Sequence, residues 1–187
     1  MDKRLQIGKE KYDKVHNELL EKGIDLLSQI LLIDASLSKL SDFVQVSKTT
    51  IYEHFQSSYQ KFLSEVLSYS RDKLRTEYLK NFDDNPAKNI VTIYEIWHDE
   101  IYKNKLFTIY CYAAYILLKD TDLLPKPLIV RDLTEQLTLL EATDDEKEEF
   151  LNQFFYSSGE GILADKTALD KKIVKIKSYL DSIKNKI

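Results

Sequence analysis

The sequence predicts an all-helical fold of roughly nine helices joined by short polar connections. Its 187 residues include only 4 Gly and 3 Pro, whereas average usage is roughly 7% and 5%. An all-β sandwich or barrel needs many more of these turn residues. Apolar residues instead recur at spacings of three and four along much of the chain. With 43% hydrophobic residues, the chain has enough apolar material for a folded core.

The first expected helix starts near Lys11. Its apolar face consists of Val15, Leu19, Leu20, Ile24, Leu27 and Ile30. Gly23 lies inside this run, where it costs about 1 kcal/mol relative to Ala. A second helix that crosses closely at this point would explain the glycine.

Two short helices follow the first one. Asp34 or Ser36 is the expected N-cap of a helix that holds Leu37, Leu40 and Phe43. After about three residues, Ser47 caps a third helix that holds Ile51, Tyr52 and Phe55. Two helices this short with so brief a connection are typical of a helix-turn-helix.

The rest of the chain reads as further helices with recognisable start signals. Helices are expected at about 57–80, from 86 to about 101, at 107–118, at 128–140, from 144 and from 168. Asn85-Pro86 combines an N-cap with a proline at the first helical position. Thr143-Asp144-Asp145-Glu146 and the similar run 167–170 are capping boxes.

Composition excludes several classes of protein. Cys111 is the only cysteine, so the chain has neither an intramolecular disulfide nor a C-x-x-C motif. The nearly apolar run 107–118 is shorter than the roughly 20 residues of a membrane span, and the N-terminus lacks the apolar stretch of a signal peptide. We therefore expect a cytoplasmic protein without membrane contact. The net charge of −4 gives no global indication of nucleic-acid binding.

No arrangement of residues predicts catalysis, a metal or a cofactor. His16, His54 and His98 are widely separated and lack the spacing of metal ligands. Gly159-Glu160-Gly161 begins a G-x-G-x-x-A run, but the residues before it read as helix rather than as the strand that a dinucleotide site needs. We expect neither an enzyme nor a cofactor-binding protein.

The segment 47–55, Ser-Lys-Thr-Thr-Ile-Tyr-Glu-His-Phe, is the most specific stretch of the chain. Ile51 and Phe55 would hold this helix on the core. Lys48 supplies a charge for phosphate, and the hydroxyls of the threonines and Tyr52 can reach phosphates or base edges. The alternative from spacing alone is a capped core helix with an ordinary polar face.

The same segment resembles the recognition helix of the tetracycline-repressor (TetR) family, whose pattern is roughly S-K-x-T-L/I-Y-x-H-F. Leu40 and Val46 also fall at the family's apolar positions, and the resemblance covers about residues 11–67. It implies a DNA-binding headpiece at 1–56 and a ligand-binding and dimerisation body at 57–187. It also implies a homodimeric transcriptional regulator, a repressor that a small ligand releases from its operator.

The resemblance assigns three sets of residues. The DNA-binding set is Ser36, Ser47, Lys48, Thr49, Thr50, Tyr52 and His54. The wall of a pocket for a largely apolar or aromatic ligand is Tyr69, Trp97, Tyr110, Ala114 and Phe154. The dimer interface on the last two helices is Phe150, Phe155, Ile162, Ile173, Ile176 and Leu180.

Departures from the family pattern motivate a second hypothesis. Gln45 replaces the turn glycine, and Ser58 replaces a lysine that commonly contacts phosphate. Residues 1–58 carry 8 Lys and Arg against 9 Asp and Glu, and fewer phosphate contacts mean weaker binding. The alternative is an interaction or coregulator protein on the same fold with weakened or lost DNA binding.

Overall fold

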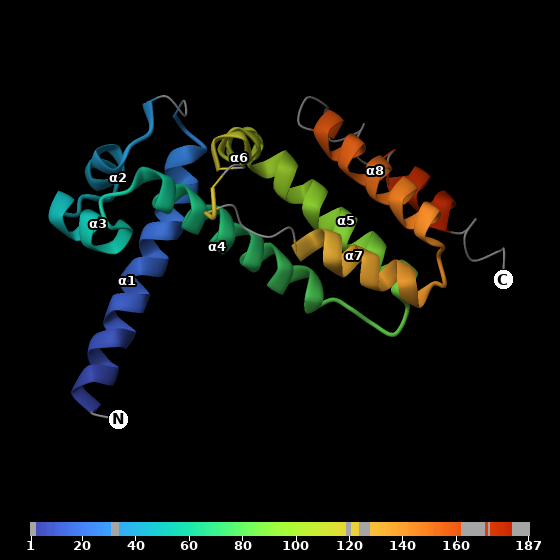
Figure 1. Ribbon diagram of the computed structural model, residues 1–187, viewed down its shortest axis with the longest axis horizontal. Helices are drawn as coiled ribbons and strands as arrows, with labels where there is room; N and C mark the ends of the chain where they lie inside the picture. The colour runs from blue at the N-terminus through green and yellow to red at the C-terminus, as the bar shows by residue number, and fades with distance from the viewer. Residues whose placement is uncertain are drawn as a thin grey trace. The chain divides into compact units, whose positions relative to one another are not determined.

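The computed structural model describes residues 3–30, 34–118, 121–123, 128–161, 171 and 173–180 (Figure 1). The described residues form eight labelled helices and a further helical stretch at 173–180, with no strand among them. The all-α prediction is therefore confirmed. The second predicted capping box, at 167–170, lies outside the described residues.

The helices follow one another with short connections. Their bounds are α1 Lys3–Leu27, α2 Leu37–Val44, α3 Lys48–Phe55, α4 Tyr59–Leu79, α5 Pro86–Lys103, α6 Lys105–Leu118, α7 Leu128–Leu139 and α8 Asp144–Gly161. The largest departure from expectation is α1, which begins at Lys3 rather than near Lys11. Residues 6–15 are all exposed, so this half of the helix has no buried apolar face for the periodicity to detect. Its Lys, Glu and Gln residues are good helix formers without burial.

Side chains cap the helices that begin at predicted signals. The side-chain oxygen of Asn85 accepts hydrogen bonds from the backbone N–H groups of Ala87 (3.1 Å) and Lys88 (3.3 Å), and Pro86 is the first residue of α5. Thr143 Oγ1 accepts from the N–H of Glu146 (3.3 Å), whose carboxylate accepts from the N–H of Thr143 (2.9 Å). Both predicted start signals are confirmed.

The chain forms two compact units. The first unit comprises Met1–Ser70 and Ile109–Pro125, and the second comprises Arg71–Thr108 and Lys126–Ile187. This division differs from the boundary expected at 56/57, because the first half of α4 packs in the first unit. A Cβ atom at Gly23 of α1 would lie 2.8 Å from side-chain atoms of both Phe62 and Val66 of α4. The close helix crossing expected at this glycine is confirmed.

In the first unit, α1 packs against α2, and α2 packs against α3. The N-terminal half of α1 extends beyond both short helices (Figure 1). The buried side chains of this unit include Leu19, Leu27, Leu40, Ile51, Phe55, Phe62, Leu63 and Val66. The two short helices are thus fixed on a core supplied by the longer ones.

In the second unit, α5, α7 and α8 pack against one another around an apolar core. Three members of the expected dimer set, Phe150, Ile176 and Leu180, are buried in this core, and Ile173 packs against it half-buried. The single chain therefore covers the three buried side chains itself. The side chain of Phe155 and all of Ile162 lie outside the described residues.

Within the described residues, no helix combines the length and the low charge that a span across a membrane requires.

Candidate nucleic-acid interface

Helices α2 and α3 form a helix-turn-helix in the first unit. Ser36 caps α2 by accepting a hydrogen bond from the backbone N–H of Lys39 (3.2 Å). Residues 45–47 connect the two helices, and Gln45 adopts the left-handed conformation at φ 57° and ψ 37°. Its N–H bonds to the carbonyl of Ser41. Gln45 thus takes the backbone conformation for which glycine is favoured, as the sequence predicted.

Ser41 holds this turn from inside. Its buried hydroxyl donates to the carbonyl oxygen of Val46 (2.6 Å), and its own carbonyl accepts from the N–H of Val46 (3.2 Å). Together with the bond from Gln45, these contacts fix the short connection. The direction in which α3 leaves the turn is therefore determined by side-chain and backbone bonds of one residue.

Ser47 is the N-cap of α3, as predicted. Its hydroxyl oxygen accepts from the N–H of Thr50 (3.2 Å) and lies 2.9 Å from the hydroxyl of the same threonine. The two hydroxyls are therefore hydrogen-bonded to each other. Ser47 and Thr50 thus form the start of the helix, and the exposed hydroxyl next to them belongs to Thr49.

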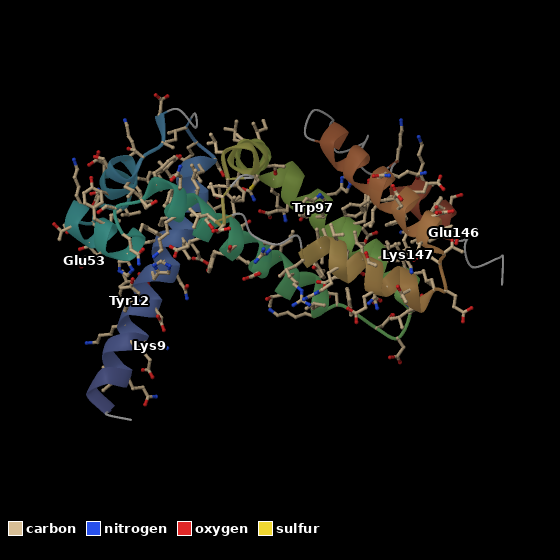
Figure 2. All side chains as sticks on the ribbon, viewed as in Figure 1. Lys9, Tyr12, Glu53, Trp97, Glu146 and Lys147 are labelled. Atoms are coloured by element: carbon tan, nitrogen blue, oxygen red, sulfur yellow. The ribbon has the colours of Figure 1, made fainter. Side chains whose placement is uncertain are left out.

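Three residues of the predicted DNA-binding set form an exposed surface, which we call the α3 face: Lys48, Thr49 and Tyr52. Tyr52 is 40% exposed although it is a large aromatic residue. Ile51 and Phe55, on the adjoining side of the helix, are fully buried, so the helix is anchored while these three side chains remain free to contact a partner. Glu53 is also exposed, and Figure 2 labels it on α3.

His54 does not belong to this surface. Its side chain is buried, with 5% of the residue exposed, and its ring stacks on Tyr12 of α1 with ring centres 4.2 Å apart. The Nδ1 atoms of His54 and His16 lie 3.1 Å apart, within hydrogen-bond distance. The expectation that His54 contacts DNA is corrected accordingly: the residue fastens α3 to α1. Figure 2 labels Tyr12 on the part of α1 that meets α3.

His16 continues this contact to α4. Its Nε2 atom lies 3.6 Å from Oε2 of Glu65. Burial lowers the pKa of both histidines below the ordinary value of 6.5 and raises the pKa of the Glu65 carboxyl above 4.5. Sequence reasoning missed this cluster because His16 and His54 are 38 residues apart. Only the packing of α1 against the helix-turn-helix brings them together.

Ser58 has a structural role in place of the lysine that the family pattern carries. Its hydroxyl oxygen accepts from the N–H of Lys61 (3.2 Å) and so caps α4. Gln56 and Ser57, which precede it, both adopt positive φ angles, 51° and 57°. The connection between α3 and α4 is therefore built by a cap and two left-handed residues rather than by a basic side chain.

The predicted pocket residues lie in different parts of the chain. Tyr69, in the first unit, donates a hydrogen bond to Glu21 of α1 (2.9 Å). Trp97 and Phe154, in the second unit, pack with ring centres 6.5 Å apart. The side chains of Tyr110 and Ala114 lie outside the described residues. A pocket that joins these five residues stays a prediction.

A groove of about 490 Å³ lies in the first unit, between α1 and the end of α2 with the turn that follows. It is lined by Val15, Glu18, Leu19, Glu21, Lys22, Phe43, Val44, Gln45 and Val46.

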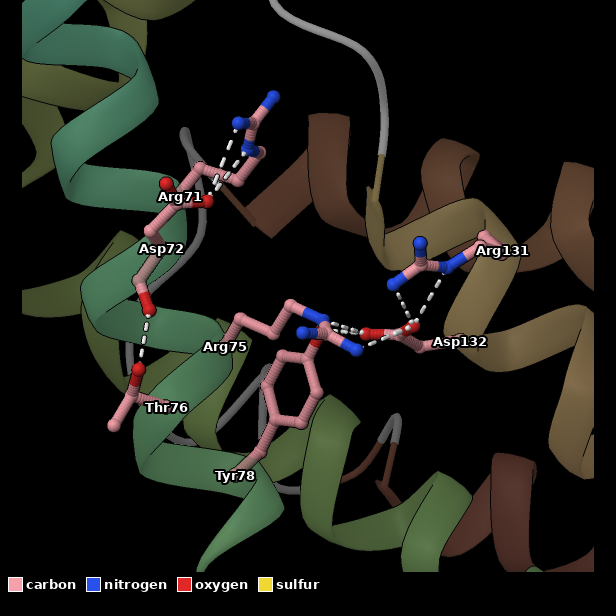
Figure 3. Close-up of polar contacts among 7 residues, drawn as sticks. All are labelled: Arg71, Asp72, Arg75, Thr76, Tyr78, Arg131 and Asp132. Atoms are coloured by element: carbon pink, nitrogen blue, oxygen red, sulfur yellow. Dashed lines mark hydrogen bonds and ion pairs between the residues drawn. The ribbon is translucent and has the colours of Figure 1, made fainter.

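The second unit contains a buried charge network around Asp132 (Figure 3). Asp132 is 3% exposed and accepts hydrogen bonds from Arg75 Nε (2.6 Å), the hydroxyl of Tyr78 (2.7 Å) and Arg131. Burial alone would raise the pKa of this carboxyl, but the three donors together leave it below its ordinary value. Arg75 and Tyr78 belong to α4, whereas Asp132 belongs to α7. The network therefore joins these two helices.

Among the described residues, no group of three or more His, Cys, Asp or Glu side chains is arranged to hold a metal ion. Comparison of the chain with protein-family models, with curated proteins and with solved structures finds no match. The argument for function therefore depends on the residues and geometry of the helix-turn-helix itself.

Proposed function

We propose that the protein is a DNA-binding transcriptional regulator, and that α3 is its recognition helix. The observation that carries this proposal is the α3 face. Lys48, Thr49 and Tyr52 are exposed together on a helix whose other side is fixed in the core. An exposed helix of this size can enter the major groove of B-form DNA, which is about 12 Å wide.

The chemistry of the α3 face suits a duplex. Lys48 is exposed at the start of α3 and would neutralise a backbone phosphate, a contact that positions the protein without reading sequence. Thr49 can donate or accept at a base edge or phosphate, and its methyl group suits the methyl of thymine. The aromatic ring and hydroxyl of Tyr52 offer both an apolar and a polar contact.

The wider proposal rests on the resemblance to the TetR family. By that resemblance the protein is a homodimeric repressor whose second unit contributes to ligand binding, and the ligand is a small, largely apolar or aromatic molecule. Release of DNA would require the ligand to bind the DNA-incompetent form more tightly.

Substitutions on the α3 face test the DNA-binding role. A duplex is first selected from a random-sequence library with the wild-type chain, and its affinity is then measured for each variant. Tyr52→Ala and Thr49→Ala should each lower affinity for this duplex by about tenfold or more, since one good base contact contributes about 1–3 kcal/mol. Lys48→Ala should weaken binding to selected and random duplexes alike.

Lys80→Ala is the matched control for Lys48→Ala, because Lys80 is exposed but lies in the second unit, directly after the last residue of α4. Circular dichroism checks that each variant is folded. Unchanged affinity in all three α3-face variants would refute the assignment of α3 as the recognition helix.

A second candidate is an interaction or coregulator protein on the same fold. The slight acidic excess of residues 1–58 and the exposed Glu53 next to the α3 face favour it. In this case the folded wild-type chain would select no duplex, even at low salt, where phosphate contacts are strongest.

A further inference from the structure

We propose that a chain of three side chains, Glu65–His16–His54, positions the α3 face and makes its affinity for DNA fall as the solution becomes acidic. The three residues come from α4, α1 and α3. None of them lies on the α3 face, so we assign them as positioning residues. The DNA-affinity part of this inference rests on the proposed function, whereas the contacts among Glu65, His16 and His54 do not.

The charge of Glu65, taken with the distances, assigns the tautomer of each histidine. His16 has Nδ1 3.1 Å from Nδ1 of His54 and Nε2 3.6 Å from Oε2 of Glu65. This Oε2 atom is buried and makes no hydrogen bond of ordinary length. A lone pair on Nε2 would repel the ionised carboxylate, so neutral His16 carries its proton on Nε2. Its Nδ1 then accepts, and Nδ1–H of His54 donates.

The contact between α1 and α3 therefore depends on an acceptor that a proton can remove. One proton added to Nε2 of His54 leaves the bond between the two rings in place. A second proton on Nδ1 of His16 places two N–H groups against each other at hydrogen-bond distance and breaks the bond. The pair consequently titrates as a unit.

The charged groups around the pair, and the stacked ring of Tyr12, come from all three helices. They are Tyr12 and Asp13 on α1, Glu53 on α3, and Lys61 and Glu65 on α4. Asp13 and Glu53 favour protonation of the nearest histidine, whereas Lys61 opposes it. Burial outweighs the acidic neighbours, so the pKa of both histidines is lowered and the pair is neutral at pH 7.

The sign of the effect follows from these directions. Because folding lowers both histidine pKa values, the stability that the pair contributes is complete above pH 6.5 and declines as the pH falls through the lowered values, until the second proton breaks the bond. Glu65 acts in the opposite sense, because its pKa is raised by folding, but its titration starts from the lower value of 4.5.

Simple electrostatics predicts the reverse for DNA binding. Acidification makes any protein more positive, which strengthens its attraction to phosphates. The proposed chain instead loosens α3 and weakens binding. The direction of the pH dependence thus separates the two mechanisms without reference to its size.

The experiment measures affinity for the selected duplex between about pH 7.5 and about pH 5.5 at constant ionic strength. Wild-type affinity should fall by up to about tenfold towards the acid end of this range, where the second proton binds to the pair. His16→Asn keeps an acceptor close to the position of Nδ1 and does not titrate, so it should bind well at pH 7.5 and lose most of the pH dependence. Glu10→Gln removes a titratable group from the exposed half of α1 and should behave as wild type. Equal pH dependence in wild type and His16→Asn would overturn the proposal.

Nuclear magnetic resonance of the wild-type imidazole nitrogens tests the chain without DNA. We expect neutral His16 to carry its proton on Nε2 at pH 7.5, and we expect the pKa of its imidazole to lie below the ordinary value. A proton on Nδ1 of His16 would overturn the proposal even if DNA binding is found. If the protein selects no duplex, the proposed function fails. The imidazole spectrum alone then decides whether Glu65, His16 and His54 are linked as proposed.

Discussion

Gly23 shows how one missing side chain sets the distance between two helices. A Cβ atom there would lie 2.8 Å from atoms of Phe62 and Val66, whereas nothing lies within 4 Å of a Cβ at Gly8 in the same helix. We expect Gly23→Ala to lower the free energy of unfolding by about 1–3 kcal/mol, because overpacking exceeds the gain in helix propensity. Gly8→Ala should raise it by up to about 1 kcal/mol.

Urea unfolding followed by circular dichroism measures both glycine variants. The two substitutions are chemically identical and lie in one helix, so the difference between them isolates the contact with α4. Similar changes of the same sign would mean that the crossing of α1 and α4 is not tight at Gly23.

Asp132 should make the second unit sensitive to strong acid. Since hydrogen bonds lower the pKa of its carboxyl in the folded chain, the stability it contributes is present above the unfolded value of about 3.9 and is lost as the pH falls below it. Asp132→Asn should lower the free energy of unfolding by about 2 kcal/mol at pH 7. The difference from wild type should shrink as the pH approaches 3, in unfolding curves that follow Trp97 fluorescence.

Asp72→Asn is the control for this prediction, because Asp72 is exposed and pairs with Arg71 at the surface. It should change the free energy of unfolding by less than about 1 kcal/mol. An Asp132 variant as stable as this control would contradict a structural role for the buried network.

Single residues with distant partners were the least predictable part of the molecule. Asp132 and Arg75 are 57 positions apart, and His16 and His54 are 38 apart. No local spacing links them, because the packing of separate helices creates the contact. Gly23 was predictable since a glycine inside an amphipathic helix has a local cost that needs an explanation.

At the scale of elements, the helix starts that carry a side-chain cap were predicted well. Ser36, Ser47, Asn85 and Thr143 each bond to the backbone of the turn that follows. The start of α1 was missed because its first turns are exposed and polar, so hydrophobic periodicity could not report them. Hydrophobic periodicity indicates which part of a helix is buried, whereas a capping residue indicates where the helix begins.

The connection between α2 and α3 stores strain that a glycine would relieve. A residue with a Cβ atom pays about 1 kcal/mol or more in the left-handed region that Gln45 occupies. We expect Gln45→Gly to raise the free energy of unfolding by about 0.5–1 kcal/mol, measured by urea unfolding. Gln60→Gly is the matched control in the exposed part of α4 and should lower it by about 1 kcal/mol. A loss of equal size in both variants would show that Gln45 is not strained.

At the scale of the whole molecule, the chain divides into two compact units. The amino-acid composition did not reveal the boundary between them. The expected boundary at 56/57 followed the end of the recognition motif, but α4 continues through the division at Ser70. A helix without a break carries no linker signal. The α3 face could be predicted because its residues lie within five positions on one helix, whereas the expected pocket and dimer surface required knowledge of tertiary packing.

The packing of the second unit narrows the predicted dimer surface. Phe150, Ile176 and Leu180 are covered within one chain, so a second copy would have to contact outward residues of the same elements. Val174 is the outward apolar residue of the described helical stretch at 173–180, and it is 67% exposed. In the dimer that the resemblance implies, Val174 is therefore the described residue of this stretch that we expect at the contact between copies.

We expect light scattering at micromolar concentration to give twice the 21.9 kDa of one chain. Val174→Glu should shift the mass towards the monomer, because it buries a charge against an apolar surface, whereas Lys175→Glu, at the exposed neighbouring position, should leave the dimer intact. Two recognition helices related by a two-fold axis would read half-sites about 34–36 Å apart, so loss of the dimer should also lower affinity for the selected duplex. A wild-type chain that is monomeric and still binds this duplex would contradict the predicted two-fold dimer. The proposal that the α3 face contacts DNA would then stand without it.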